Sequence, residues 1–459
     1  MKIGLQSSRF CATIALYFLK GVDSMEFMTG KSDTLYKLDD IIAAPNGAMV
    51  KTNGFVHKIR DMSGFAFVVL RKSDTLVQCV IDGPYDFTDG SCIEIEGEKK
   101  DDKRAPNGFE IVIKKVTVLS NPVEQMPVII NKKELTTSLD VNIATRPVSL
   151  RNVYERAVFK LQEGVARGFR EYLQQNGFTE IHTPKIVAAG AEGGANIFKM
   201  DYFGKKAFLA QSPQFYKQTM VGVFERVFEV GPVFRAEKHS TTRHMNEYTS
   251  LDFEMGFING FEDIMEMEAG LLQYMMALIE KDYAKHLDIL GITLPKTDRI
   301  PVVKFAEIKQ LVAEKYNRKT KDLYDIDPEE EQLIGKYIKE EYDADFVFVT
   351  HYPTKKRPFY AMDDPADPAY TLSFDLLFRG IEITTGGQRI HDYNEQCEKM
   401  RRKGLDPAEF ENFLMIHKHG MPPHGGLGIG LERLTMKLLD KSNVRLTTLF
   451  PRDVTRLTP

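Results

Sequence analysis

The chain has 459 residues, 43% of them hydrophobic, and a formal net charge of −4 at pH 7. Its length exceeds that of one typical domain, so we expect two domains with sizeable cores. The near-neutral charge excludes a uniformly basic surface for nucleic acid, and any such binding must come from local basic patches.

Residues 1–33 are predicted to be a leader outside any domain, either disordered or upstream of the true start. The apolar run at residues 11–19 follows Lys2 and Arg9, as in a signal peptide. The run is too short to span a bilayer, and neither a small-residue cleavage site nor a later membrane segment is visible. The four cysteines lack the spacing of zinc ligands or of a disulfide framework. We therefore expect a cytoplasmic protein without membrane contact.

Residues 34–131 contain short strand patterns separated by turn signals such as Asn53-Gly54 and Asn107-Gly108. Five strands in about a hundred residues predict a small closed barrel of the OB-fold type. The strands are expected near residues 48–59, 65–70, 76–81, 91–98 and 109–119.

One barrel strand carries Phe67, the next carries Gln78, and Lys58 and Arg60 lie nearby in the sequence. A stacking ring, an amide and positive charge together suit single-stranded nucleic acid. An aromatic residue on a barrel strand is more often part of the core, so both interpretations of Phe67 stay open.

Residues 132–152 form a polar connection, which we expect to act as a hinge before a second domain at residues 153–459. Asn152 and Glu155 have the spacing of a helix capping box, and apolar residues keep helical spacing up to Gly177. Residues 178–183 then have the pattern of a strand that ends at Pro184. These residues alone would also fit an ordinary helix–strand unit.

Charged residues gather on a strand pair predicted at residues 226–237 and 248–254. Arg235, Glu237, Asp252 and Glu254 would converge on one surface of this antiparallel pair. A solvated sheet face with ion pairs is the alternative interpretation. A loop of small residues with a single acid, Glu192, precedes the pair.

Two later segments carry further candidate groups. Asp375 and Glu382 lie on neighbouring predicted strands and could bind Mg²⁺ through oxygen, although paired acids on strands commonly face solvent. Residues 424–433 place a GxGxG turn before a helix. A P-loop is excluded because Lys and Ser/Thr do not follow, and a Rossmann unit because no βαβ pattern precedes. The helical stretches at residues 261–289 and 300–342 have no chemistry assigned.

Several of these segments resemble one family. Phe234-Arg235-Ala236-Glu237 followed by Arg243-His244 resembles motif 2 of class II aminoacyl-tRNA synthetases, and residues 211–218 (QSPQFYKQ) resemble the aspartyl-specific signature within that class. Residues 153–184 are similar to motif 1 and residues 424–433 to motif 3. The resemblance implies an α+β protein with an N-terminal OB-fold β-barrel that binds the anticodon and a class II antiparallel-sheet catalytic domain. It also implies a homodimer formed through motif 1.

The resemblance further implies roles for individual residues. Arg235 and Arg433 would be catalytic, and Phe67 and Gln78 would bind the anticodon. L-Aspartate would be bound by Glu192, Gln214, Lys217, Asp252 and Arg389. ATP would be bound by Arg235, Glu237, Arg243, His244, Tyr248, Glu382, Gly428, Gly430 and Arg433, and Mg²⁺ by Asp375, Glu382 and Thr385.

The implied reaction is ATP-dependent activation of L-aspartate to aspartyl-adenylate and its transfer to tRNA(Asp). Family members restricted to that tRNA differ from relaxed members at two barrel positions. This chain has the relaxed residues there, His57 and Pro106, so tRNA(Asn) is expected as a second substrate. The alternative is that His57 is a surface residue and Pro106 only a turn former.

Two other functions stay open from the residues. One is an asparaginyl enzyme of the same architecture, which Lys217 opposes because a neutral amide would leave its charge without a counter-charge. The other is a non-catalytic tRNA-binding paralogue. Such a protein would be expected to have lost some of the four residues Arg235, Asp375, Glu382 and Arg433, all of which this chain keeps.

Overall fold

The structure is a computed structural model that describes residues 37–188, 196–239 and 241–458. The predicted leader and Glu192 lie outside these residues. The chain divides into two compact units, residues 1–125 and residues 126–459, and each is described by itself.

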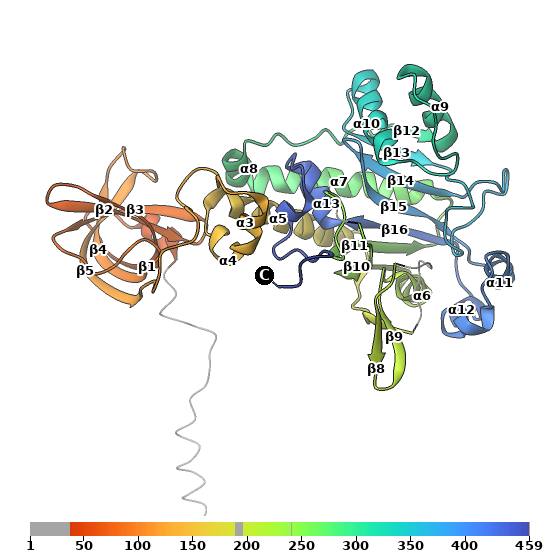
Figure 1. The fold of residues 1–459 in the computed structure, drawn as a ribbon, viewed down its shortest axis with the longest axis horizontal. Coiled ribbons are helices and arrows are strands. Elements are labelled where there is room, and N and C mark those ends of the chain that lie inside the picture. The colour runs from red at the N-terminus through yellow and green to blue at the C-terminus, as the bar shows by residue number, and fades with distance from the viewer. Residues whose placement is uncertain (1–36, 189–195, 240, 459) are drawn as a thin grey trace, which may run out of the picture. The chain divides into compact units, whose positions relative to one another are not determined.

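The first unit is a closed five-stranded barrel with the strand order β1-β2-β3-β5-β4 (Figure 1). Buried and less buried residues alternate along β2, because successive side chains of a strand point to opposite faces. The inward residues form one apolar core that includes Val68, Ile93 and Ile111. The predicted OB-fold barrel is thereby confirmed. Its elements are α2 (Leu38–Ala43), β1 (Met49–Asp61), β2 (Phe65–Lys72), β3 (Thr75–Asp82), β4 (Cys92–Asp101) and β5 (Phe109–Ser120).

The second unit is built on an eight-stranded sheet with the order β12-β13-β14-β15-β16-β11-β10-β6. Neighbouring strands are antiparallel except for the pairs β6–β10 and β12–β13. The predicted antiparallel catalytic sheet and the α+β class are confirmed. The strands are β6 (Thr179–Glu180), β10 (Arg226–Phe234), β11 (Glu247–Gly256), β12 (Val302–Lys304), β13 (Phe346–Thr350), β14 (Ser373–Phe378), β15 (Ile381–Arg389) and β16 (His424–Gly430).

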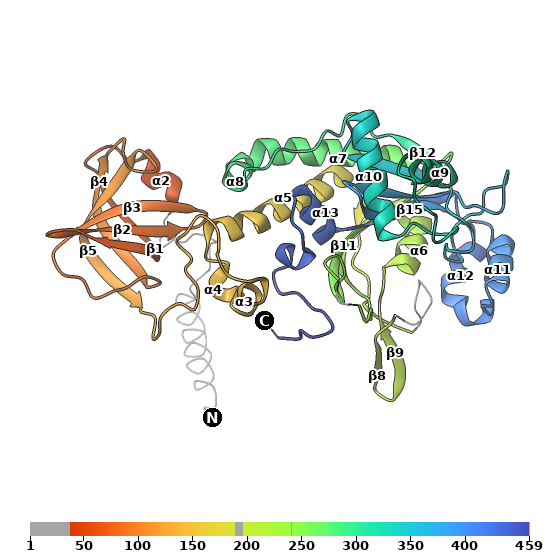
Figure 2. The ribbon, with the colours of Figure 1, turned by 45° about the horizontal axis from the view of Figure 1, so that its top comes forward.

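Two long helices, α5 (Val153–Gln175) and α7 (Glu262–Asp282), lie side by side against this sheet (Figure 2). Gly168 lets them approach closely, since a Cβ there would lie 3.1 Å from the Cα of Met275. Phe169, Leu251 and Phe253 belong to the core between the helices and the sheet. The other helices are α3 (Leu139–Ala144), α4 (Arg146–Ser149), α6 (Gln214–Phe224), α8 (Ala284–Leu290), α9 (Phe305–Lys315), α10 (Pro328–Tyr342), α11 (Tyr393–Arg402), α12 (Glu411–Lys418) and α13 (Leu431–Leu438).

The connection predicted as a hinge is more ordered than its polar sequence indicates, because it contains α3 and α4. Arg146 is fully buried there and donates hydrogen bonds to the backbone oxygens of Leu449, Arg445 and Thr448. This fixes the connection to the C-terminal part of the same unit.

The predicted capping box at the start of α5 is wrong in its second half. The Asn152 side chain accepts hydrogen bonds from Tyr154 N and Glu155 N, as expected of an N-cap. The Glu155 carboxylate does not reach back to Asn152, because it pairs with Asn142 and the buried Arg146. A buried guanidinium without a counter-charge costs more free energy than a helix end without a second cap, so Glu155 pairs with Arg146.

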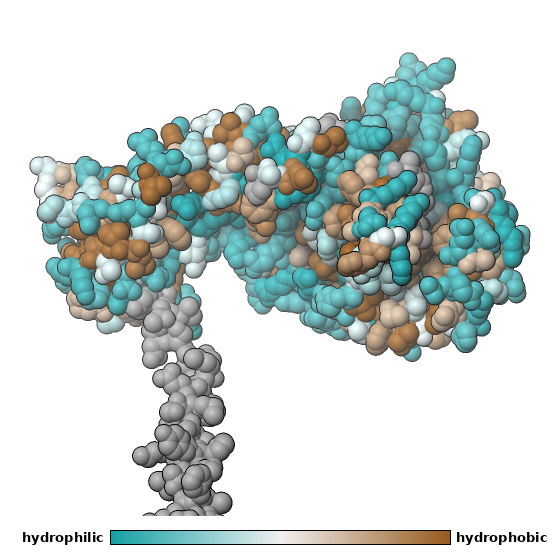
Figure 3. Space-filling model, turned by 60° about the horizontal axis from the view of Figure 1, so that its bottom comes forward, coloured by the Kyte–Doolittle hydropathy of each residue, from teal (hydrophilic) through white to brown (hydrophobic). Residues whose placement is uncertain are grey.

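A small three-stranded sheet, with the order β7-β9-β8, completes the second unit. It consists of β7 (Ile186–Val187), β8 (Lys199–Tyr202) and β9 (Lys205–Leu209). In the described part of the chain, no helix combines the length and the apolar character needed to cross a membrane. The face of the molecule in Figure 3 is largely hydrophilic, with small hydrophobic patches between the polar residues.

Candidate active site

A pocket of about 500 Å³ opens on the face of the large sheet that is opposite to α5 and α7. Leu251 and Phe253 point into the core beneath these helices, so Ser250 and Asp252 on β11 point to the other face, where both line the pocket. All described residues predicted to bind aspartate, ATP or Mg²⁺ line this single pocket. They are Gln214, Lys217, Arg235, Glu237, Arg243, His244, Tyr248, Asp252, Asp375, Glu382, Thr385, Arg389, Gly428, Gly430 and Arg433.

At one end of the pocket, α6 directs Lys217 toward two acids of β11. Lys217 Nζ lies 2.9 Å from Asp252 Oδ1 and 3.2 Å from Glu254 Oε2, and it donates to the backbone oxygen of Leu427 at 2.8 Å. Arg389 from β15 donates to Glu254 Oε1 at 2.8 Å and to the backbone oxygen of Gly426 at 2.9 Å. These side chains are almost completely buried, so the interpretation of β11 as a solvated charged face is wrong.

The charges at this end balance within the chain. Burial raises the pKa of Glu254, but the charges of Arg389 and Lys217 outweigh it, so the pKa lies below its usual range. Burial lowers the pKa of His424 to about 3, which leaves the ring neutral. Two cations therefore face two carboxylates. Contrary to the expectation from the sequence, an amide substrate would not leave Lys217 without a counter-charge, because Asp252 and Glu254 already provide it.

Two acceptors in the same place have no hydrogen-bond donor among the described residues. Asp252 Oδ2 and Gln211 Oε1 are buried, and both residues line the pocket. An unpaired buried acceptor costs free energy unless a ligand supplies a donor. A substrate ammonium group would supply several.

Arg235 and Glu237 do not lie on the sheet face where the strand pattern placed them. The registered pairing of β10 with β11 ends at Phe234 and Glu247, so Arg235 and Glu237 come after the end of the strand. Asn246 fixes the backbone of Arg235 after the strand ends: its backbone oxygen accepts from Arg235 N at 2.9 Å, and its side-chain amide donates to the Arg235 oxygen at 2.7 Å. Both predicted residues still line the pocket.

Arg433, at the start of α13, connects the segments that line the other end of the pocket. Its Nε donates to the backbone oxygen of Arg243 at 3.2 Å, and its terminal nitrogen donates to the backbone oxygen of Glu382 at 3.3 Å. His244 lies 3.7 Å from Glu237. Burial lowers the pKa of His244 although Glu237 opposes this, so the ring is neutral near pH 7.

The three predicted metal ligands share one region of β14 and β15. Asp375 pairs directly with Thr385 across the strands, and the Thr385 hydroxyl donates to Glu382 at 3.2 Å. Burial raises the pKa of Asp375 to about 6, and the charge of Glu382 adds to this while Arg357 opposes it. Among the described residues no three His, Cys, Asp or Glu side chains group as a metal site. A hard cation here would complete its shell with oxygens of a ligand or water.

The structure adds pocket residues for which the sequence offered no motif. Arg357 is mostly buried, donates to Asp375 Oδ1 at 2.8 Å and lies 3.9 Å from the centre of the Tyr352 ring. Lys356 lines the rim and pairs with Asp322 and Asp325. The run Lys355-Lys356-Arg357 was the only available signal, and a basic run is more commonly a solvated surface.

On the barrel, Phe67 lies outside the core cluster that contains its neighbours Ala66 and Val68. The core interpretation of Phe67 is therefore wrong. The Arg60 guanidinium lies 5.2 Å from the centre of its ring and donates to Gln78 Oε1 at 3.4 Å. Gln78 donates in turn to Glu110 at 3.1 Å. The structure thus brings the predicted ring and amide together on the barrel surface.

The two residues predicted to govern tRNA choice lie in different settings. His57 occupies a bulge of β1 between Val56 and Lys58 and is only 5% exposed, so the surface interpretation of His57 is wrong. Pro106 is exposed in the turn between β4 and β5.

Comparison with known proteins agrees with this arrangement. Residues 138–454 match the family "tRNA synthetases class II (D, K and N)", and residues 50–119 match the family "OB-fold nucleic acid binding domain". An aspartate–tRNA(Asp/Asn) ligase of Deinococcus radiodurans is 48% identical over 90% of this chain and 96% of its own length. A ligase of the same name from Thermus thermophilus is 47% identical over 90% and 97%.

Among solved structures, the asparaginyl-tRNA synthetase of Pyrococcus horikoshii complexed with asparaginyl-adenylate matches with a TM-score of 0.83. It is 30% identical, and the match covers 90% of this chain and 97% of that one. The matched fold, the length shared with these relatives and the pocket that collects residues of motif 2, motif 3 and the 211–218 signature together place the chain in the class II aminoacyl-tRNA synthetases of the D, K and N group.

Proposed function

We propose that the protein is an aspartate–tRNA ligase. The observation that carries this proposal is a pocket lined by two buried cations, Lys217 and Arg389, and by the unpaired acceptor Asp252 Oδ2. Such a site suits an amino acid with an ammonium group and an acidic side chain. The names of the relatives that share 47–48% of the sequence support the same substrate.

In this proposal, each end of aspartate has its own partners. Asp252, with Gln214 and the undescribed Glu192, receives the α-ammonium group, and Lys217 with Arg389 receives the β-carboxylate. The Lys217 ammonium already has three acceptors, so the substrate must take over one of them. Arg235, which lines the pocket, is suited to hold the α-carboxylate and α-phosphate, because a guanidinium offers a planar fork of donors.

The reaction requires no side chain as nucleophile. The aspartate α-carboxylate oxygen attacks the α-phosphorus of ATP, the bond to the β-phosphate oxygen breaks, and pyrophosphate leaves. A ribose hydroxyl at the tRNA 3′ end then attacks the carbonyl carbon of the aspartyl-adenylate, and AMP leaves. Arg235 and Arg433 stabilise negative charge during the first step, and Tyr248, Gly428 and Gly430 shape the nucleotide pocket. A Cβ on Gly428 would lie 3.0 Å from Asp252 Oδ1, so the absence of a side chain there leaves room for the Asp252 carboxylate.

The residues around Asp375 fit a divalent cation. Asp375, Glu382 and Thr385 offer hard oxygen donors in one place, and the proximity of two carboxylates contributes to the raised pKa of Asp375. We propose that they hold Mg²⁺ together with ATP, where the ion would neutralise phosphate charge. Arg357 would then share Asp375 with the ion, because it already donates to that carboxylate.

We propose that the barrel holds an anticodon base between Phe67 and Gln78, and that His57 and Pro106 permit both tRNA(Asp) and tRNA(Asn). The ring of Phe67 outside the core supports the first part. The second part is tested by aspartylating transcripts that carry either anticodon. An efficiency with the Asn anticodon within about tenfold of the Asp anticodon supports relaxed choice. A gap of about a thousandfold, or roughly 4 kcal/mol, contradicts it.

We further propose a homodimer formed through the region of α5 and β6, working in the cytoplasm. The short strand β6 is at the edge of the large sheet. Exposed apolar side chains, Val223, Phe224 and Phe257, flank the start of the neighbouring strand β10 and the end of β11. Sedimentation of the protein at micromolar concentration tests this, since a species of one chain only would contradict it. The free thiols of Cys79, Cys92 and Cys397 agree with a reducing compartment.

An asparaginyl enzyme is the second candidate. Two observations favour this candidate: the charge of Lys217 is balanced within the chain, and the fold matches the structure of an asparaginyl-tRNA synthetase. Charging of total tRNA with labelled aspartate or labelled asparagine separates the two. Incorporation of aspartate alone supports the proposal, and incorporation of asparagine alone replaces it.

A further inference from the structure

The helix α10 belongs to the stretch at residues 300–342 that had no chemistry assigned from the sequence. One of its residues, Glu331, is 4% exposed and does not point to solvent. Its two carboxylate oxygens accept from the two terminal nitrogens of Arg243, at 2.7 and 3.0 Å. This is a two-point ion pair between residues 88 positions apart.

Glu331 closes a ring of contacts around the nucleotide end of the pocket. Its carboxylate also accepts from the backbone N–H of Glu382 at 3.2 Å. Arg433 donates both to the backbone oxygen of Arg243 and to that of Glu382. The ring therefore runs from Glu331 to Arg243, to Arg433, to Glu382 and back to Glu331. Three of its members are predicted ATP residues, and Glu331 is the fourth.

The helix that carries Glu331 is fixed against the sheet at several points. A Cβ on Gly335 would lie 2.4 Å from the nitrogen of Gly380. Glycine at both positions therefore allows the close approach of α10 to the turn between β14 and β15. The Gln332 amide donates to the Gly380 oxygen at 2.6 Å. These contacts set the position of Glu331 relative to β15.

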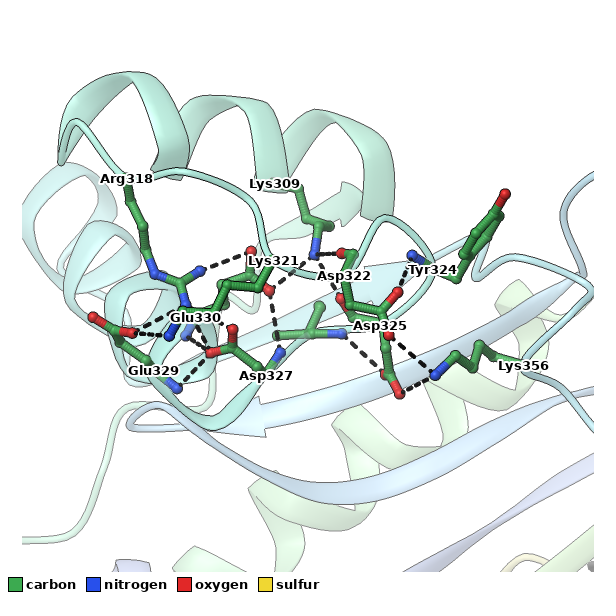
Figure 4. A network of polar contacts seen from close by, with 11 residues as sticks. Lys309, Arg318, Lys321, Asp322, Tyr324, Asp325, Asp327, Glu329, Glu330 and Lys356 are labelled. Atoms are coloured by element: carbon green, nitrogen blue, oxygen red, sulfur yellow. Dashed lines mark hydrogen bonds and ion pairs between the residues drawn. The ribbon is translucent and has the colours of Figure 1, made fainter.

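The N-terminal end of α10 is fixed as well (Figure 4). Asp327 and Glu330 form a capping box, and Arg318 pairs with both of their carboxylates. Lys309 from α9 donates to Glu330 at 2.9 Å. A helix held at its end and along its side can present one carboxylate to Arg243 without further adjustment.

We propose that Glu331 is a positioning residue that holds Arg243 in place for ATP. The inference deepens the proposed function, because it names a residue that acts on the nucleotide through another residue. The pair with Glu331 uses two of the five N–H groups of a guanidinium, so the others stay available to a ligand. Arg243 lines the pocket, and its Nε is buried without an acceptor among the described residues. Loss of Glu331 would free the guanidinium to sample other rotamers.

The test is a comparison of Glu331→Gln with wild type in the full chain. The probe is ATP with a methylene group between its α and β phosphorus atoms, which binds without reacting, measured by calorimetry with Mg²⁺. We expect its Kd to rise by about tenfold or more, while the KM for aspartate in ATP–pyrophosphate exchange stays within about twofold. The matched control is Glu329→Gln on the same helix turn, where Glu329 pairs with Arg318 and Lys321 at the surface, and its Kd should not change.

A double-mutant cycle separates positioning from a general loss of structure. If Glu331 acts through Arg243, then Glu331→Gln added to Arg243→Ala should change the Kd by no more than about twofold. Because this double variant removes both charges of the pair, it leaves no unpaired buried charge that would destabilise the protein. Additive effects in the cycle, or an unchanged Kd in Glu331→Gln, would overturn the inference. A wild-type protein that binds the analogue but lacks exchange with aspartate would count against the proposed function, and the Kd values would still decide the role of Glu331.

Discussion

Replacement of Lys217 by Met should show how the charge cluster at the aspartate end is built. The side chain is 2% exposed and its ammonium contacts Asp252, Glu254 and the Leu427 oxygen. Met has a similar length but no charge, so Asp252 loses its cation and Glu254 keeps only Arg389. Removing one partner of a buried ion pair costs about 3–5 kcal/mol. A loss of that size is a large fraction of the roughly 5–15 kcal/mol of a typical native state.

A second substitution distinguishes charge balance from substrate binding. Lys217→Met combined with Asp252→Asn removes one cation and one anion and leaves the pair of Arg389 and Glu254 intact. We expect urea unfolding to recover about 1–3 kcal/mol of the lost stability in this double variant. The aspartate KM should stay raised by about 100-fold or more in both variants, because the β-carboxylate has lost a desolvated cation in both and the α-ammonium group has also lost the Asp252 carboxylate in the double variant. Binding of the ATP analogue should change by less than about threefold.

Lys185→Met serves as the matched control for this experiment. Lys185 also pairs with a buried acid, Glu229, at 2.8 Å, but it does not line the pocket. It should therefore lose stability without a change in the aspartate KM. A Lys217→Met protein that is as stable as wild type, or whose aspartate KM is within a few-fold of wild type, would refute the reasoning.

The remaining predictions address the other parts of the site. Arg235→Lys keeps the charge but loses the fork of donors, so the rate of ATP–pyrophosphate exchange should fall by about a hundredfold or more with an unchanged unfolding curve. Near-normal activity would mean that another arginine stabilises the negative charge in this step. Burial raises the pKa of Asp375 from its usual value of 3.8 to about 6, so ionisation of Asp375 lowers the stability of the wild type as pH rises from about 4 to about 6, and the loss levels off above that. Asp375→Asn should therefore gain stability relative to wild type over this range, and a difference that does not grow between about pH 4 and pH 6 would contradict this. Phe67→Ala should raise the KM for tRNA by about tenfold through lost stacking and leave exchange, which needs no tRNA, unchanged.

Sequence reasoning found the fold because the patterns that specify it are local. The barrel strands alternate between inward and outward residues, and turn signals such as Asn107-Gly108 separate them. The residues predicted to bind aspartate, ATP or Mg²⁺ lie in motifs that resemble a family, and the described ones all line one pocket. Where Arg235 lies relative to β10 was predicted wrongly, since the exact end of a strand depends on the loop that follows.

The contacts that the sequence did not predict are those made between distant segments. Glu331 lies in a charged helix that resembles a solvated face, and only the close approach of Gly335 to Gly380 brings it to Arg243. Arg357 lies in a basic run, and its burial against Tyr352 and Asp375 follows from packing of the whole unit. The sequence pattern indicated Asp252 and Glu254 as charged residues of one sheet face, but only their distances from Lys217 show that its charge is already balanced.

ATP–pyrophosphate exchange with aspartate, asparagine or no amino acid tests the central claim most directly. The purified chain is incubated with ATP, Mg²⁺ and labelled pyrophosphate, and label in ATP is counted. We expect label only with aspartate, because the substrate must take over one of the three acceptors of the Lys217 ammonium, and a carboxylate is a stronger acceptor for a cation than an amide oxygen. Exchange with asparagine and not with aspartate, or no exchange with either by a protein that binds ATP, would contradict it.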